Sequence, residues 1–182
     1  LASSDSTYLQ LAREQCAGAE NMTDRLAAVK VLAFRGDEAD WQPALDSFYQ
    51  AWQHEALVVN QWLAVQAAMP DSGVLERVER LLQHPDFDLR NPNKVRSLVG
   101  TFAGQNPVNF HRADGEGYRF LADRVAELNA INPQIAARLL TPLTKWRYYR
   151  GRGELMRAQL ERLAAIDALS PDVYEVVSKS LK

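Results

Sequence analysis

The sequence predicts an all-α fold: a HEAT- or armadillo-like, right-handed superhelix of about ten helices in antiparallel pairs. Apolar residues recur at helical spacing throughout, and no segment keeps the period-two alternation of a half-buried strand. Helix starts of one kind also recur about every forty residues, which is the length of a helix-pair repeat. An ordinary irregular helical domain is the simpler alternative.

Five helices are expected in the first half of the chain, each placed by its apolar spacing and by residues that cap or end helices. They are a helix through Leu9, Ala12 and Cys16 that ends at Gly18; a helix with Asn21 and Asp24 as a capping box, ending at Gly36; a helix opened by Asp40 and Pro43; residues 55–69, closed by Pro70; and a helix capped by Ser72 that ends before His84.

The second half is marked by prolines that directly follow capping residues. Asn91, Asn106, Asn132 and Ser170 each precede a proline, and proline is well tolerated at the first helical position because its missing N–H would be unpaired there. Asn91 and Asn132 lie 41 residues apart, and Asn132 and Ser170 lie 38 apart. Further helices are expected from Glu116 to Ala130 and from Glu154 to Ala165, with a kink at Pro142.

Composition favours a single helical domain over residues 1–182. Of these residues 47% are hydrophobic and 24% charged, which is typical of a globular protein. Residues 1–90 carry 7 basic and 14 acidic side chains, a net charge of −7, whereas residues 91–182 carry 14 and 9, a net of +5. Anionic ligands are therefore expected in the second half.

The cellular setting is predicted from a few residues. Cys16 is the only cysteine, so no internal disulfide can form, and a reducing, cytoplasmic location is expected. No apolar run is long enough to cross a membrane, so no membrane partner is expected. The first residue is Leu1 rather than Met, which favours a fragment of a larger protein.

Known catalytic motifs are incomplete in this sequence. His54-Glu55 begins like the zinc motif His-Glu-x-x-His, but position 58 is Val, so the second imidazole is missing and no metal site is expected. The glycines match no phosphate-binding loop. Gly100 and Gly104, four residues apart in the helix that starts at Asn91, favour close helix packing rather than ligand binding.

Two arginines stand among apolar residues at corresponding positions of the repeat. Arg96 lies five residues after Asn91, and Arg138 lies six after Asn132. Each is either a structural ion-pair partner or a cation that lines a cleft. If their helices run side by side about 8–10 Å apart, both guanidinium groups can project into one concavity. Gln134 shares the helix face of Arg138, and the three side chains would suit a carboxylate or a peptide backbone.

Residues 145–152 mix basic and aromatic side chains, as nucleic-acid-binding surfaces do. An amphipathic helix end followed by a basic loop is the interpretation favoured here. The overall charge is negative and no nucleic-acid-binding motif is present. No nucleic-acid partner is therefore expected.

The chain resembles the C-terminal helical domain of bacterial aminopeptidase N (alanyl aminopeptidase), a family of zinc metallo-aminopeptidases of the gluzincin group. The resemblance extends over nearly the whole chain and is densest from Asn91 to Pro142. It is carried by residues 21–28, Leu81-Leu82-Gln83-His84, Asn91–His111, Asp114-Gly115-Glu116-Gly117-Tyr118, Leu128-Asn129, Asn132-Pro133-Gln134, Arg138-Leu139 and residues 169–175.

The resemblance implies a non-catalytic role. In that family the zinc motif lies in a separate domain, and the helical superhelix packs over the catalytic domain and closes an internal chamber. Two arginines and a glutamine of the superhelix meet the peptide beyond the scissile bond, and they align with Arg96, Arg138 and Gln134. The implied partners are the catalytic domain of the same polypeptide and a peptide substrate, with no cofactor in this segment and zinc only in the catalytic domain.

The leading hypothesis is therefore a lid and substrate-channel domain of a zinc-dependent aminopeptidase, inactive by itself. The alternative is a free-standing HEAT-like interaction scaffold or a nucleic-acid binder.

Overall fold

The structure is a computed structural model, and it describes residues 6–182. These residues form helices and connecting loops, with no strand among them. The elements are α1 (Ser6–Gly18), α2 (Met22–Arg35), α3 (Glu38–Trp52), α4 (Ala56–Ala68), α5 (Val74–Leu81), α6 (Pro92–Val95), η1 (Arg96–Gly100), α7 (Thr101–Gln105), α8 (Pro107–Phe110), α9 (Glu116–Asn129), α10 (Pro133–Leu139), α11 (Thr141–Thr144), η2 (Trp146–Tyr148), α12 (Gly153–Ala164) and α13 (Pro171–Leu181).

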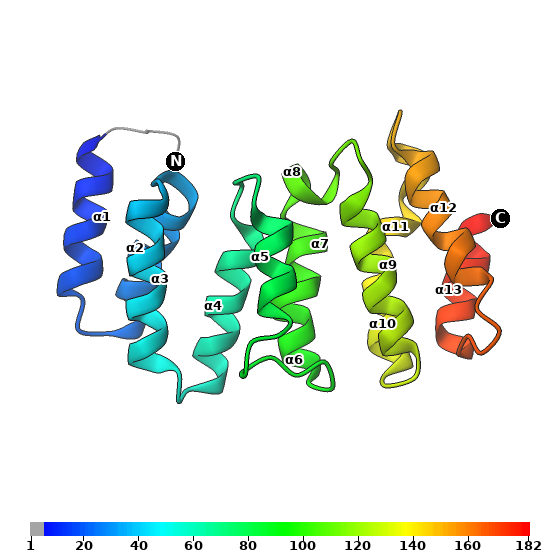
Figure 1. Ribbon diagram of the computed structural model, residues 1–182, viewed down its shortest axis with the longest axis horizontal. Coiled ribbons are helices and arrows are strands. Elements are labelled where there is room, and N and C mark those ends of the chain that lie inside the picture. The colour runs from blue at the N-terminus through cyan, green and yellow to red at the C-terminus, as the bar shows by residue number, and fades with distance from the viewer. Residues whose placement is uncertain (1–5) are drawn as a thin grey trace.

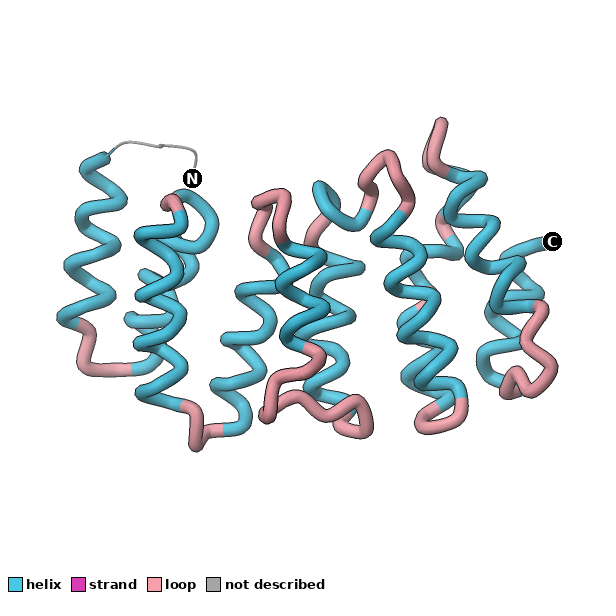
Figure 2. The backbone as a smooth tube through the Cα atoms, in the orientation of Figure 1, coloured by secondary structure: helices cyan, strands magenta, loops and turns pink. Residues whose placement is uncertain are grey.

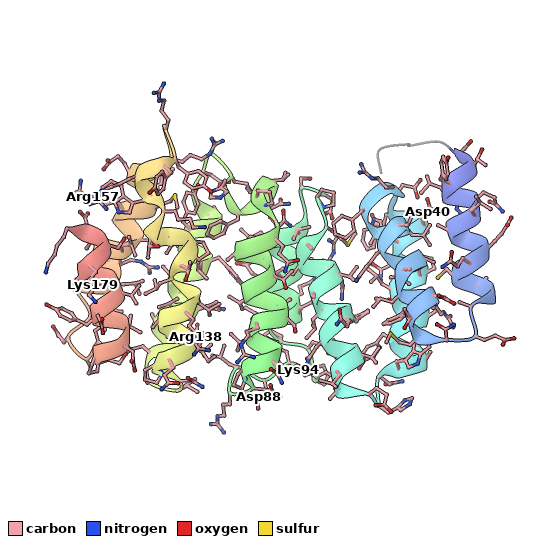
Figure 3. The ribbon with its side chains drawn as sticks, turned by 180° about the vertical axis from the view of Figure 1, so that it is seen from behind. Asp40, Asp88, Lys94, Arg138, Arg157 and Lys179 are labelled. Carbon is pink, nitrogen blue, oxygen red and sulfur yellow. The ribbon has the colours of Figure 1, made fainter. Side chains whose placement is uncertain are left out.

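The longer helices stand roughly parallel or antiparallel in two layers. Helices α3, α5, α9 and α12 form the layer nearer the viewer in Figure 1. Helices α2, α4, α6–η1–α7, α10 and α13 form the layer nearer the viewer in Figure 3. Helix α1 packs on α2 at one end of the array, α13 lies at the other, and the loops gather at the upper and lower edges (Figure 2). The predicted all-α, armadillo-like class is confirmed, whereas the right-handed superhelix stays a prediction.

Polar side chains cap the helices where the sequence predicts them. The side-chain oxygens of Asn21, Asn91, Asn132 and Ser170 each accept a hydrogen bond from a backbone N–H in the first turn of the following helix. Three of these residues begin α6, α10 and α13, which all belong to one layer. The spacing of about forty residues therefore marks successive units of the array, as predicted.

Hydrogen bonds between successive units have the same spacing. The side-chain amide of Asn129 donates to the carbonyl oxygen of Ala168 at 3.0 Å, 39 residues on. The side-chain oxygen of Asn129 accepts from the N–H of Ser170 at 2.8 Å. Arg162 pairs with Asp123, again 39 residues away, at 2.7 Å. The unit that contains α9 is thus held to the last unit by polar contacts as well as by the continuous apolar core.

Some predicted boundaries are wrong, for local reasons. Helix α3 begins at Glu38, because Asp37 accepts from the N–H of Asp40 and acts as the N-cap, so that Pro43 lies inside the helix. Helix α5 has Gly73 rather than Ser72 at its N-cap position.

Pro142 breaks the helix instead of merely kinking it. Helix α10 ends at Leu139, and a separate turn, α11, begins at Thr141 with the proline in its first positions. This follows from the missing N–H of proline and from its clash with the preceding turn.

Candidate functional site

Arg96 lies in a continuous rod formed by α6, η1 and α7. Its middle part, Arg96–Gly100, is a π-helical turn, in which the N–H of Thr101 bonds to the carbonyl oxygen of Arg96, five residues back. Such wide turns are uncommon and often occur at functional sites. The Arg96 side chain is exposed, and its guanidinium donates to the Asn93 side-chain oxygen at 2.8 Å. This one hydrogen bond orients the guanidinium without neutralising it.

Gln134 and Arg138 lie on α10, and both side chains are exposed. Among residues 6–182 neither Arg96 nor Arg138 has an acidic group within ion-pair distance. The structural ion pair, one of the two alternatives left by the sequence, is therefore absent from the described part of the chain. Neither guanidinium group is neutralised by an acidic partner in this part of the chain, so both can pair with an anionic ligand.

The rod and α10 are neighbours in the same layer, as the repeat spacing predicts. Figure 3 shows Arg138 on α10 beside the rod. Gly100 provides a direct contact, because a Cβ atom on it would lie 3.7 Å from Leu139 Cδ2 and 3.9 Å from the Cβ of Arg96. Arg96 thus lies beside the Gly100–Leu139 contact, and Arg138 directly precedes Leu139 in the chain. Gly104 does not have the predicted packing role, since a Cβ there would meet nothing within 4 Å.

Lys94 is a basic residue near Arg96 that the sequence analysis did not identify. Its side chain is buried, with 8% of the residue exposed, and no ion pair or side-chain hydrogen bond is formed by it in the described structure. Burial lowers the pKa of Lys94, and the negative charge of Asp86 partly opposes that shift. A lysine in the first turn of a helix also opposes the helix dipole. Only its position two residues after a capped Asn-Pro start could have signalled it.

A cavity of about 430 Å³ opens between the upper end of the rod and the segment from α11 to Tyr149. Its polar lining includes Gln105, Lys145 and His111. The remaining lining residues are Ala103, Gly104, Pro107, Thr141, Pro142 and Tyr149. The sequence analysis assigned no site here, because these residues lie up to 46 positions apart and only the fold brings them together.

His111 is held rigidly in the wall of this cavity. Its Nδ1 lies 2.8 Å from the hydroxyl of Tyr118, and its ring stacks on Tyr149 with centroids 4.1 Å apart. Burial, followed by the positive charge of Arg152, lowers the pKa of His111, which favours the uncharged ring at neutral pH. Burial also raises the pKa of Tyr118. Lys145 is therefore the cation of this cavity lining.

Three of the basic and aromatic residues 145–152 contact the rest of the fold. Trp146 Nε1 and a guanidinium nitrogen of Arg147 both donate to the carbonyl oxygen of Ser180, at 3.1 and 2.8 Å. The Tyr149 ring stacks on His111, whereas Tyr148 is 86% exposed. One exposed ring is not the row of stacking platforms that single-stranded nucleic acids need.

The incomplete zinc motif lies at the junction between α3 and α4. His54 and Glu55 are exposed loop residues, and Val58 stands inside α4. Residues 6–182 contain no group of three or more His, Cys, Asp or Glu side chains placed to hold a metal ion. No helix in the same range has the length and apolar character that a membrane crossing requires.

The two-layer array and its helix-pair units define an α-helical repeat domain of the armadillo kind. Residues 1–182 match the family described as "Domain of unknown function (DUF3458_C) ARM repeats", and the chain belongs to this family.

Three similar curated proteins are named aminopeptidase N. Aminopeptidase N of Caulobacter vibrioides is 48% identical over 164 residues, which are 90% of this chain and 19% of that protein. Aminopeptidase N of Haemophilus influenzae is 46% identical over 90% of this chain and 19% of its own length. For aminopeptidase N of Escherichia coli the identity is 44%, over 94% and 20%. The chain therefore spans about one fifth of the length of these relatives, and the predicted resemblance to aminopeptidase N is confirmed.

A solved structure is also similar. It is described as the crystal structure of Legionella pneumophila aminopeptidase A in complex with aspartic acid. It matches with a TM-score of 0.90 and 35% identity, over 96% of this chain and 21% of that one.

Proposed function

We propose that this chain is the non-catalytic helical segment of a zinc-dependent aminopeptidase, an enzyme that releases N-terminal amino acids from peptides. The observation that carries the proposal is the similarity to three proteins named aminopeptidase N, at 44–48% identity over at least 90% of this chain. The segment serves as a lid over the catalytic domain of the same polypeptide and as one wall of the substrate channel. The zinc ion and its ligands belong to that catalytic domain.

In this proposal Arg96, Gln134 and Arg138 hold the part of the peptide beyond the scissile bond. Two exposed arginines without acidic partners, on neighbouring helices of one layer, support this role. A guanidinium group can bind a peptide carboxylate by two parallel, charge-assisted hydrogen bonds. Such contacts are remote from the reacting carbonyl, so they contribute binding and orientation rather than bond cleavage.

The test compares two substrates in the full-length enzyme. With Arg96→Ala or Arg138→Ala, KM should rise about tenfold or more for a tripeptide with a free carboxylate, the loss expected for one hydrogen bond to a charged group. KM for an amino-acid anilide, which lacks that carboxylate, should change by less than about twofold, since only the remote contact is lost. Arg80→Ala provides the matched control, because Arg80 is an exposed arginine on α5 in the other layer.

Equal effects on both substrates would show that the arginines act on the fold and not on the peptide. The isolated chain, supplied with zinc, should release no amino acid from peptides. Release that depends on zinc would contradict the non-catalytic role.

A further inference from the structure

The cavity next to Lys145 lies in line with the two arginines. On the rod, Arg96 and Gly100 are surface neighbours, and Gly104 follows four residues later in the cavity lining. On the facing segment, Arg138 is followed by Thr141, whose hydroxyl donates to the carbonyl oxygen of Arg138 at 2.9 Å. Thr141 also lines the cavity. The same two segments therefore carry the arginines first and the cavity lining further along the chain.

The polar groups of the cavity are suited to an anion. Lys145 and Gln105 lie on opposite sides, and neither side chain has a hydrogen bond or ion pair within residues 6–182. No acidic residue lines the cavity. The stacked rings of His111 and Tyr149 both line the cavity, and Gly104 leaves the opposite side open. An ammonium group and an amide donor that converge on one space can together bind a carboxylate.

We propose that this cavity is a second peptide subsite, in which Lys145 and Gln105 bind a carboxylate of a longer substrate. The inference rests on the proposed function, because it extends the channel that begins at Arg96 and Arg138. The carboxylate is either the C-terminus of the peptide or an Asp or Glu side chain. Peptides too short to reach the cavity are held by Arg96, Gln134 and Arg138 alone.

The spacing along the rod sets the length of peptide required. Gly104 is eight residues beyond Arg96, and a helix rises by about 1.5 Å per residue, so the two levels are about 12 Å apart. An extended peptide advances about 3.3 Å per residue. The carboxylate that reaches Lys145 is therefore three or four residues beyond the peptide residue that meets Arg96.

The experiment measures KM and kcat of the full-length enzyme for peptides of two to eight residues that share one N-terminal sequence. Lys145→Ala should raise KM about threefold to tenfold for peptides that reach the cavity, with kcat unchanged, as loss of a partly exposed charge-assisted hydrogen bond predicts. KM for di- and tripeptides should stay within about twofold, because these peptides do not reach the cavity. Two further peptide sets distinguish the sources of the carboxylate. Amidated peptides lack the C-terminal carboxylate, and amidated peptides with one internal Glu carry a side-chain carboxylate only.

Two further variants separate the cavity from the general charge of the loop. Arg150 is an exposed cation of the same loop, but it does not line the cavity. In Arg150→Ala the dependence of KM on peptide length should therefore remain. Gly104→Met places a side chain in the cavity where a Cβ meets no protein atom within 4 Å, so the fold should be kept while the site is blocked. This variant should reproduce the effect of Lys145→Ala.

The inference is overturned if neither Lys145→Ala nor Gly104→Met changes KM for long peptides, or if Arg150→Ala has the same effect as Lys145→Ala. It is also overturned if the effect does not depend on a carboxylate. In each of these cases the proposed function still stands when Arg96→Ala and Arg138→Ala raise KM for tripeptides. If those arginine variants have no effect either, the channel itself is refuted.

Discussion

Replacement of Asn106 by alanine should weaken the array at its middle. Asn106 is 2% exposed, and its side-chain amide donates to the carbonyl oxygens of Ala67 and Met69 at 2.9 and 2.8 Å. Both carbonyls lie at the C-terminal end of α4, where helix geometry leaves carbonyl groups unpaired. The Asn106 side-chain oxygen also accepts from the N–H of Asn109 and caps α8. One buried side chain thus completes the ends of two helices that lie almost forty residues apart.

The size of the effect follows from these contacts. Each buried carbonyl that loses its partner costs about 1–3 kcal/mol, and the loss of an N-cap costs about 1 kcal/mol. Asn106→Ala should therefore lower the free energy of unfolding by about 3–5 kcal/mol. For a chain of this size, 1 kcal/mol corresponds to about 2–4 °C in Tm, so Tm should fall by roughly 10 °C.

Urea denaturation followed by circular dichroism measures this change. Asn106→Asp is the matched variant, since it keeps the capping oxygen but turns a carboxylate toward two carbonyl oxygens. It should be at least as destabilising as alanine. A loss below about 1 kcal/mol for Asn106→Ala, or an Asp variant close to wild type, would refute the assignment of the stability to the two amide donors.

Two other predictions concern local packing and pH. Gly117→Ala should lower the free energy of unfolding, measured in urea, by about 1–3 kcal/mol, because the added Cβ would lie 2.5 Å from the carbonyl oxygen of Phe110. Gly104→Ala is the control. Its Cβ would have no neighbour within 4 Å, so the variant should be neutral or slightly stabilising. The hydrogen bond from Arg13 lowers the pKa of Asp40 in the folded state. The pair therefore stabilises the fold fully above the unfolded-state pKa of Asp40, which is about 4. This stabilisation is lost as the pH falls through the lower folded-state pKa. Wild type and Arg13→Ala should accordingly differ in stability at pH 7 and converge at about pH 2, and a constant difference would exclude this linkage.

The helix starts could be predicted from the sequence because capping is a local interaction. Asn91 accepts hydrogen bonds from residues two and three positions on, so the residues that decide the start are adjacent in the chain. Asp37 acts in the same way, but Asp40 and Pro43 follow it closely and also resemble a helix start, so the sequence alone places the boundary too late. The repeat spacing was visible for a related reason, since each unit of the layer begins with the same kind of cap.

The candidate site could be predicted only in part. The spacing of Arg96 and Arg138 placed them on neighbouring helices, but their apolar sequence neighbours suggested more burial than the structure has. The π-helical turn could not be foreseen, because it depends on how the rod packs against α4 and α10. The cavity around Lys145 was missed because its two walls come from segments whose contact depends on the break at Pro142.

The wide turn at Arg96–Gly100 makes the rod one residue longer than a regular α-helix of the same height would be. A π-helical turn advances by fewer degrees per residue than an α-helix, so about five of its residues cover the rotation of about four α-helical ones. Deletion of one residue within the turn would therefore restore ideal geometry and leave the rest of the rod in place. Gly104 would still line the cavity, and Asn106 would still reach the carbonyls at the end of α4. Only the backbone at the level of Arg96 would shift, so the extra residue changes the shape of the rod locally while the helix contacts above and below it are kept.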